Sequence, residues 1–169
     1  MIYTTFPTLI GQLVATAENG ALTALYESET VPERAESIKA RSETVFCRLG
    51  EQLDDYWKGE AVSFDIPVAP SGTPFQIRVW RALRDIPYGH TISYGELAQR
   101  IGKPTAVRAV GRANGANPIA IVIPCHRVIG GNGSLVGYAG GLERKKALLS
   151  LEGALSGAEP KSASGGRIG

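Results

Sequence analysis

The first third of the chain changes from a strand-like to a helix-like spacing of its apolar residues. Residues 2–30 contain short β-type runs, and two of them flank Glu18-Asn19-Gly20. An Asn-Gly pair between such runs is a strong signal for a hairpin. In residues 33–58 apolar side chains recur at spacings of three, four and seven, which predicts an amphipathic helix. Residues 61–69 alternate again and predict one further strand.

The next stretch has the composition of a linker followed by a helix start. Residues 69–74 read APSGTP, which is rich in proline and small residues. Thr73 stands three residues before Gln76, with proline between them, and this spacing is typical of a capping box. A helix is therefore predicted over residues 74–84.

Two short helices are predicted after a turn that ends the first one. Ser93 and Glu96 have the spacing of a second capping box, for a helix that stops at Gly102. Pro104 then starts another helix, which an Asn-Pro pair ends at residues 117–118. Two short helices joined by about three residues that include a glycine match helix-turn-helix geometry.

The second of these helices has few bulky side chains. Its small residues are Ala106, Ala109, Gly111, Ala113 and Gly115. Small residues permit a close approach of the backbone to a partner, and Arg108 and Arg112 stand four positions apart on one face, where they can hold phosphates. A solvated helix that packs through its alanines would show the same pattern, and periodicity alone favours that alternative.

The last part of the chain leads from a buried segment through a glycine-rich loop to a final helix. The apolar run Ile119–Ile123 predicts the buried segment, and it ends in Pro124-Cys125-His126-Arg127. The final helix is predicted up to Gly153, and residues 154–169 are expected to be a disordered tail. The inward side chains of that helix are expected to be Leu142, Leu148, Leu149 and Leu151.

Charge divides the 169-residue chain into two unlike parts. Residues 1–72 contain 5 Lys/Arg against 11 Asp/Glu, whereas residues 73–153 contain 11 against 4. The basic part suggests a polyanionic partner such as nucleic acid, and an ordinary solvated surface is the alternative. No apolar run approaches the roughly 20 residues of a membrane helix, so no membrane association is expected.

The cysteines and histidines are few. Cys47 and Cys125 are far apart and form neither a disulfide framework nor a zinc pattern, so we expect no metal and a reducing, cytoplasmic setting. Cys47 lies one position off the apolar stripe and is expected to be a half-buried packing residue. His90 is expected to be a solvated turn residue.

Cys125 has the surroundings of a reactive thiol. A cysteine after an apolar run is more often a packing residue, but Pro124 forces a turn here. His126 and Arg127 supply a base and positive charge, the two usual means of lowering a thiol pKa. Adjacent residues in an extended segment point to opposite sides, so a bridging water is the more plausible proton route from Cys125 to His126. The orienting acid is either Glu143 or Glu152, and the sequence does not choose between them.

Residues 73–153 resemble the O6-alkylguanine-DNA alkyltransferases (methylated-DNA–protein-cysteine methyltransferases), most closely the constitutive bacterial branch. The resemblance rests on five features in order: the Ser-Tyr pair at 93–94, RAVG at 108–111, Asn-Pro at 117–118, PCHRVIG at 124–130 and Leu-Glu-Gly at 151–153. It implies an α+β fold. A small ribonuclease-H-like α/β domain is expected over residues 1–72, and a helical DNA-binding domain with a helix-turn-helix over residues 73–153.

The resemblance also implies roles for individual residues. Cys125 would be the acceptor thiolate, His126 its base through a water, Glu152 the acid that orients His126, and Tyr94 the donor to the leaving base. The expected DNA-binding residues are Tyr94, Thr105, Arg108, Ala109, Gly111 and Arg112, with Arg108 as a wedge in the duplex. The expected pocket residues are Asn117, Val128, Val136, Gly137, Tyr138, Ala139 and Gly140.

The reaction implied by the resemblance is direct repair. The alkylated base would be flipped out of the stack, and Cys125 would take the alkyl group from guanine O6 or thymine O4 as a thioether. Each molecule would act once, without a cofactor, on alkylated double-stranded DNA. A monomer in solution is expected, with cooperative binding along DNA as an open alternative. Two rival functions are a Cys-His hydrolase and a non-catalytic helix-turn-helix DNA-binding protein.

Overall fold

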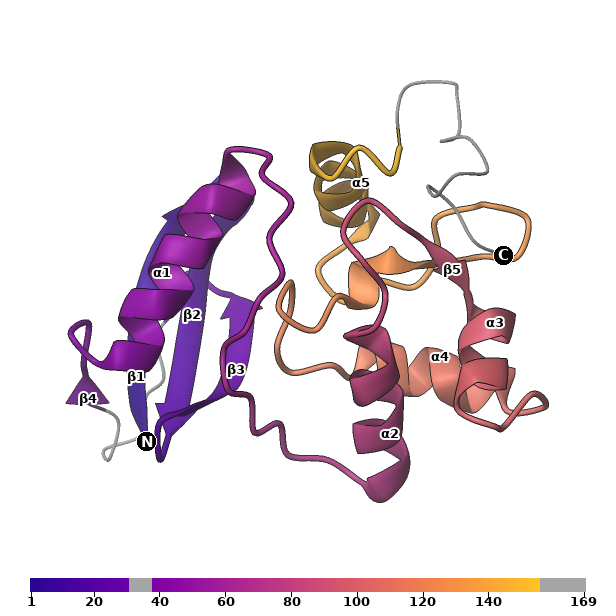
Figure 1. The fold of residues 1–169 in the computed structure, drawn as a ribbon, viewed down its shortest axis with the longest axis horizontal. Helices are drawn as coiled ribbons and strands as arrows, with labels where there is room; N and C mark the ends of the chain where they lie inside the picture. Colours follow the sequence, from indigo (N-terminus) through magenta and orange to yellow (C-terminus); the bar gives the residue numbers. More distant parts are fainter. Residues whose placement is uncertain (31–37, 156–169) are drawn as a thin grey trace. The chain divides into compact units, whose positions relative to one another are not determined.

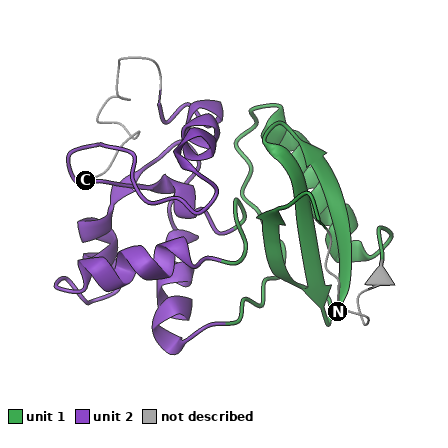
Figure 2. Ribbon diagram, turned by 180° about the vertical axis from the view of Figure 1, so that it is seen from behind, with its two compact units in different colours: residues 1–71, 118–122 green, residues 72–117, 123–169 purple. Residues whose placement is uncertain are grey.

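A computed structural model describes residues 1–30 and 38–155, and its fold is α+β, as predicted (Figure 1). The chain divides into two compact units (Figure 2). The first contains residues 1–71 and 118–122, and the second contains residues 72–117 and the chain from 123 onward. The division near residue 72 lies where the linker was predicted, but the short stretch 118–122 belongs to the first unit.

The first unit is built on a four-stranded sheet with the order β3-β2-β1-β4. Its strands are β1 (Ile2–Thr8), β2 (Gly11–Glu18), β3 (Ala21–Glu27) and β4 (Ile38–Lys39). Strands β1, β2 and β3 pair antiparallel, and β4 pairs parallel to β1. Asn19 and Gly20 have φ of 50° and 77°, the left-handed pair that a type I′ turn requires, so the hairpin prediction is confirmed.

Helix α1 (Thr44–Trp57) covers one face of this sheet (Figure 1). Its buried side chains are Val45, Phe46, Leu49, Leu53 and Tyr56. The prediction of a helix over residues 33–58 is wrong at its start, because Ile38 and Lys39 form β4 instead; residues 31–37 lie outside the described residues. Pairing with the edge of β1 outweighs the helical spacing of the apolar residues. The Ala40 N–H continues this pairing, because it donates to the Tyr3 carbonyl at 2.9 Å.

The strand predicted over residues 61–69 is present only as one isolated bridge. Leu22 N–H donates to the Pro67 carbonyl and its own carbonyl accepts from Ala69 N–H, both at 2.8 Å. Pro67 has no N–H to donate, so a longer ladder is not available there. Cys47 is exposed rather than half-buried.

In its described part, the second unit contains four α-helices: α2 (Pro74–Leu83), α3 (Tyr94–Arg100), α4 (Val107–Gly115) and α5 (Leu142–Leu151). The first capping box is confirmed, since Gln76 N–H donates to Thr73 Oγ1 at 3.1 Å and Thr73 N–H donates to Gln76 Oε1 at 2.9 Å. The second is only half formed. Ser93 accepts from Glu96 N–H, but the Glu96 carboxylate pairs with Arg100 at 3.1 Å.

Helix α4 begins at Val107, three residues later than predicted. Residues 101–106 form turns, with Gly102 at φ 73° and with Lys103 N–H bonded to the Ala98 carbonyl at 2.9 Å. The connection between α3 and α4 is therefore six residues long, not about three. The indole of Trp80 donates to the Ala113 carbonyl at 2.7 Å, which fastens α2 to α4.

Helix α5 differs from the prediction in what it buries. Leu148 and Leu149 are buried as expected, but Leu142 is 47% exposed and Leu151 is half-buried. Lys145 is fully buried instead. Ala154 packs with Leu149, so the ordered chain continues past residue 153, and the remaining predicted tail, 156–169, lies outside the described residues.

A short parallel pair, β5 (Ile92–Ser93) and β6 (Val128–Ile129), completes the second unit. Strand β6 directly follows η1 (Cys125–Arg127), a single 3₁₀ turn. None of the helices in the described residues is long and apolar enough to span a membrane.

Candidate active site

The buried segment predicted before Cys125 is present but irregular. Ile119, Ile121 and Ile123 are each at most 1% exposed. Ile121 has φ 70°, a region that β-branched residues rarely occupy. The chain then enters η1 at Cys125, so the thiol lies in a tight turn rather than at the end of a strand.

The structure chooses Glu152 as the acid beside His126. The Nε2 atom of His126 lies 2.7 Å from Glu152 Oε1, and both side chains are fully buried. Arg127 donates to the same carboxylate through Nε at 2.9 Å and a terminal nitrogen at 2.8 Å, and to the Ile86 carbonyl at 2.7 Å. Glu143, the other candidate, is exposed.

Pairing holds this cluster in a defined charge state. Burial alone would raise the pKa of Glu152, but the His126 and Arg127 partners outweigh it and keep that pKa far below its usual value. Burial lowers the pKa of His126, against the opposing effect of Glu152. A neutral imidazole that donates from Nε2 to a carboxylate has its lone pair on Nδ1.

That second ring nitrogen is available for a proton. Nδ1 of His126 is buried, and none of the described residues hydrogen bonds to it. Burial raises the pKa of Cys125, while the amide of Asn117 and the charge of Lys145 act to lower it. The resting state is therefore a buried thiol that needs a base, and the neighbouring imidazole has an unused acceptor.

A cavity of about 470 Å³ opens beside helices α3 and α4. Its lining residues are Tyr94, Val107, Arg108, Gly111, Arg112, Val136 and Gly137. Predicted DNA-binding and pocket residues thus lie around one hollow. The Tyr94 hydroxyl donates to the Val136 carbonyl at 2.9 Å and lies 3.3 Å from the Gly137 carbonyl. Burial raises the pKa of Tyr94, which keeps this hydroxyl protonated at neutral pH.

The remaining predicted residues lie outside this lining. Asn117 donates to the Ile123 carbonyl at 2.7 Å, two residues before the thiol. Val128 is fully buried in β6, and Thr105 is exposed in the turn before α4. Three predicted pocket residues follow Gly137 in the loop: Tyr138, Ala139 and Gly140. Ala109 is half-buried on α4.

Comparison with known proteins places this arrangement in one family. Residues 74–154 match the family model described as the 6-O-methylguanine DNA methyltransferase, DNA binding domain. A methylated-DNA–protein-cysteine methyltransferase of Mycolicibacterium paratuberculosis is 50% identical over 150 residues, which is 89% of this chain and 91% of the relative. The chain belongs to the methylated-DNA–protein-cysteine methyltransferases.

Further relatives and a solved structure agree with this membership. A methyltransferase of the same name from Methanosarcina acetivorans is 58% identical over 112 residues, 66% of this chain and 72% of that protein. The crystal structure of Mycobacterium tuberculosis OGT in complex with DNA superposes with a TM-score of 0.84 and 47% identity. That match covers 94% of this chain and 96% of the other.

Two residues of this methyltransferase site were missed from the sequence. Asn114 is buried on α4 and its amide donates to the Cys125 carbonyl at 3.3 Å. Lys145 is buried on α5 and contacts the loop that carries Val136. The signal for Lys145 was its position three and four residues before Leu148 and Leu149, which puts it on the inward face. Asn114 likewise stands four residues after the buried Val110.

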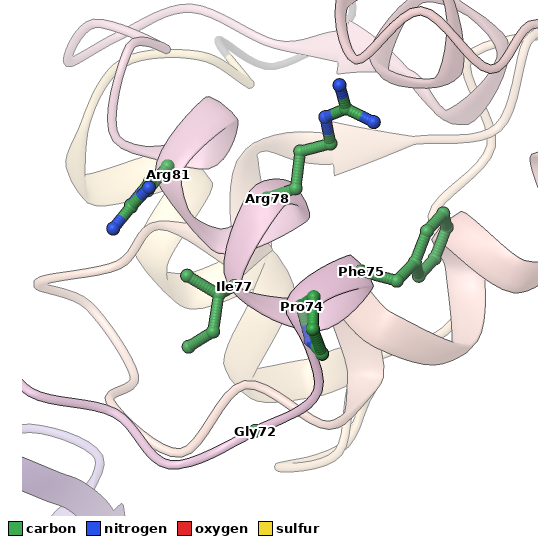
Figure 3. A pocket seen from close by; sticks show the side chains of 6 residues that line it. All are labelled: Gly72, Pro74, Phe75, Ile77, Arg78 and Arg81. Carbon is green, nitrogen blue, oxygen red and sulfur yellow. The ribbon is translucent and has the colours of Figure 1, made fainter.

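A second hollow, of about 690 Å³, lies along α2 (Figure 3). Its lining residues are Gly72, Pro74, Phe75, Ile77, Arg78 and Arg81. Arg78 and Arg81 leave the helix on different sides, and the hollow has no nucleophile or acid in its lining (Figure 3). Among the described residues no group of three or more His, Cys, Asp or Glu side chains could hold a metal ion.

Proposed function

We propose that this member of the methyltransferase family repairs DNA by moving the alkyl group from O6 of guanine, or from O4 of thymine, to its own Cys125. The observation that carries the proposal is the buried thiol next to an imidazole whose Nε2 is fixed by Glu152 and whose Nδ1 has no hydrogen-bond partner among the described residues. The relatives named as methylated-DNA–protein-cysteine methyltransferases support it over a hydrolase or a non-catalytic DNA-binding protein.

In the proposed step, Nδ1 of His126 takes the Cys125 proton through a water, and the sulfur attacks the alkyl carbon. The new carbon–sulfur bond forms as the carbon–O6 bond breaks, and the electron pair of that bond leaves with guanine. The Tyr94 hydroxyl stabilises the leaving base with a hydrogen bond. In the balance, the thiol proton passes to guanine and the protein keeps a thioether. Nothing in the step removes the alkyl group again, so each molecule acts once.

The surface beside the site supports duplex DNA as the partner. The cavity next to α4 has Arg108 and Arg112 in its lining together with the loop residues Val136 and Gly137. A base flipped from the duplex needs such a hollow, and an inserted arginine fills the space that the base leaves. A solved relative carries DNA in its crystal structure. Predicted roles for Thr105 and Ala109 as further DNA contacts remain part of the proposal.

We also propose one finer fold assignment for each unit, a ribonuclease-H-like first unit and a helix-turn-helix in the second. The strand order β3-β2-β1-β4, with β4 parallel to β1, supports the ribonuclease-H-like description of the first unit. Helices α3 and α4 in contact support the helix-turn-helix description, although their connection is longer than expected. We still expect a monomer in solution and action in the cytoplasm. Cooperative binding along DNA stays an open alternative. Both cysteines are free thiols, which a reducing compartment would preserve.

Intact mass spectrometry tests the function. The protein is incubated with a duplex oligonucleotide that contains one O6-methylguanine, and we expect a permanent gain of the mass of one methylene, located on the peptide with Cys125. Cys125→Ser is expected to gain nothing while it binds the duplex as the parent does. An unchanged parent mass contradicts the proposal, and a mass gain that later disappears indicates a hydrolase.

A further inference from the structure

Lys145 occupies an unusual place for a lysine. Its side chain has no exposed surface, and its ammonium donates to the Val128 carbonyl at 2.5 Å and to the Val136 carbonyl at 2.7 Å. Val128 is the first residue of β6, directly after the turn that carries Cys125. Val136 lies in the loop beside the cavity. The Lys145 ammonium therefore links strand β6, which directly follows the turn with Cys125, to the loop that lines the cavity.

The Val136 carbonyl is a shared acceptor. It receives the Lys145 ammonium at 2.7 Å and the Tyr94 hydroxyl at 2.9 Å, so both of its lone pairs are used. The ammonium also lies 5.8 Å from the centre of the Tyr94 ring. Lys145 thus fixes the position of the acceptor to which the Tyr94 hydroxyl is bonded.

The charge of Lys145 has no carboxylate partner among the described residues. The ionisable groups that face it are Cys125 and His126 on η1 and Tyr94 on α3. Burial lowers the pKa of Lys145 to about 8, and the Cys125 charge acts in the opposite direction. A buried ammonium without an anion is unfavourable, and ionisation of the nearby thiol would supply the missing negative charge.

We propose that Lys145 is a positioning residue of the alkyl-transfer site, which holds the Val136 loop against β6 and supplies the positive charge that the Cys125 thiolate faces. This inference rests on the proposed function for its role in repair. Its electrostatic part does not depend on DNA, because it concerns only two groups of this chain. The coupling between these groups is reciprocal: the cation favours the thiolate as much as the thiolate favours the cation.

The test measures the Cys125 thiol and alkyl transfer separately. All proteins carry Cys47→Ser, because Cys47 is exposed and would also react. The pH dependence of alkylation by iodoacetamide gives the apparent pKa of Cys125, and single-turnover kinetics on an O6-methylguanine duplex give the transfer rate. The variants are Lys145→Met, which removes the charge, and Lys145→Arg, which keeps it; Lys146→Met is the matched control, because Lys146 is the exposed neighbour.

We expect Lys145→Met to raise the apparent pKa of Cys125 by about one unit, so that alkylation at neutral pH falls about tenfold and transfer falls by at least as much. Lys145→Arg should keep the apparent thiol pKa of the Cys47→Ser parent yet transfer more slowly, because its larger, planar group changes the positions of the two carbonyls that the compact ammonium holds. Lys146→Met should match the parent in both measurements.

Equal thiol pKa values for the parent and Lys145→Met overturn the inference, whatever happens to transfer, because loss of structure alone could slow transfer. Affinity for unmodified duplex and the thermal unfolding midpoint show whether Lys145→Met is folded. If Lys145→Met is not folded, the thiol pKa of Lys145→Arg is the test instead. A raised thiol pKa in Lys145→Arg then overturns the inference. If the parent accepts no methyl group while Lys145→Met still raises the thiol pKa, the proposed function fails and the electrostatic inference stands.

Discussion

The two compact units treat their charged side chains in opposite ways. In the first unit Arg48 and Asp65 pair on the surface, where both side chains are about half exposed (53% and 51%). In the second unit the pair between His126 and Glu152 has no exposed surface at all. Among the described residues, the buried histidine, arginine, lysine and glutamate side chains all belong to the second unit: His126, Arg127, Lys145 and Glu152.

This difference separates two uses of charge. An exposed pair is screened by water, contributes little to stability and tolerates replacement. A buried pair has lost its hydration, so each member depends on its partners and removal of one leaves the other unfavourably placed. The first unit obtains its stability from an apolar core between α1 and the sheet. The second unit accepts the desolvation of several charges, which is the arrangement expected where ionisable groups perform chemistry.

The largest effect is expected from neutralising one acid in each unit. Glu152→Gln should reduce the rate of methyl transfer by about a hundredfold and lower the free energy of unfolding by about 3–5 kcal/mol at neutral pH. The equivalent change on the surface, Asp65→Asn, should leave transfer unchanged and destabilise far less. Single-turnover kinetics and chemical denaturation measure the two quantities. Equal destabilisation by the two variants would remove the contrast between the units.

The pH dependence of stability sharpens the same comparison. The folded-state pKa of Glu152 is held below its ordinary value of 4.5 by His126 and Arg127, even though burial opposes them. The carboxylate's contribution is therefore fully present above that ordinary value and is lost as the pH falls below it. The parent should lose stability between about pH 5 and pH 3, and Glu152→Gln should lose less over that interval.

A smaller effect is expected from removing one amide in each unit. Asn114→Ala takes away the bond to the Cys125 carbonyl, so transfer should slow by about five- to tenfold, the equivalent of a net hydrogen bond of about 1 kcal/mol. Gln52→Ala removes an amide that bonds to the exposed Asp65 in the first unit, and this variant should transfer methyl groups at the parent rate. Equal rates for Asn114→Ala and the parent would show that α4 does not position the thiol turn.

The smallest effect is expected from removing one surface arginine in each unit. Arg112→Ala, on α4 beside the cavity, should weaken binding to undamaged duplex and reduce the slope of log affinity against log salt by about one. Arg48→Ala lies in the acidic part of the chain and should leave that slope unchanged. Fluorescence anisotropy at several salt concentrations measures both. Equal slopes for Arg112→Ala and the parent would separate α4 from the DNA interface.

Local features were predicted well because neighbouring residues encode them. The Asn19-Gly20 hairpin and the Thr73 capping box depend on the backbone preferences of four or fewer residues, and both are confirmed. The start of α1 and the strand at 61–69 were predicted wrongly. Pairing of Ile38 and Lys39 with β1, which lies far away in the chain, overrode the helical pattern, whereas residues 61–69 find only one bridge, to Leu22, and form no strand.

The sequence by itself determined which residue types stand at the turn after Pro124: a thiol, an imidazole and a guanidinium in succession. The family resemblance implied Glu152 over Glu143, but only the tertiary structure brought Glu152 to His126, buried the Lys145 ammonium and placed Asn114 against the Cys125 carbonyl. The physical reason is separation along the chain. Glu152 is 26 residues from His126, and whether two such groups meet depends on how α5 packs, which a periodic pattern does not specify.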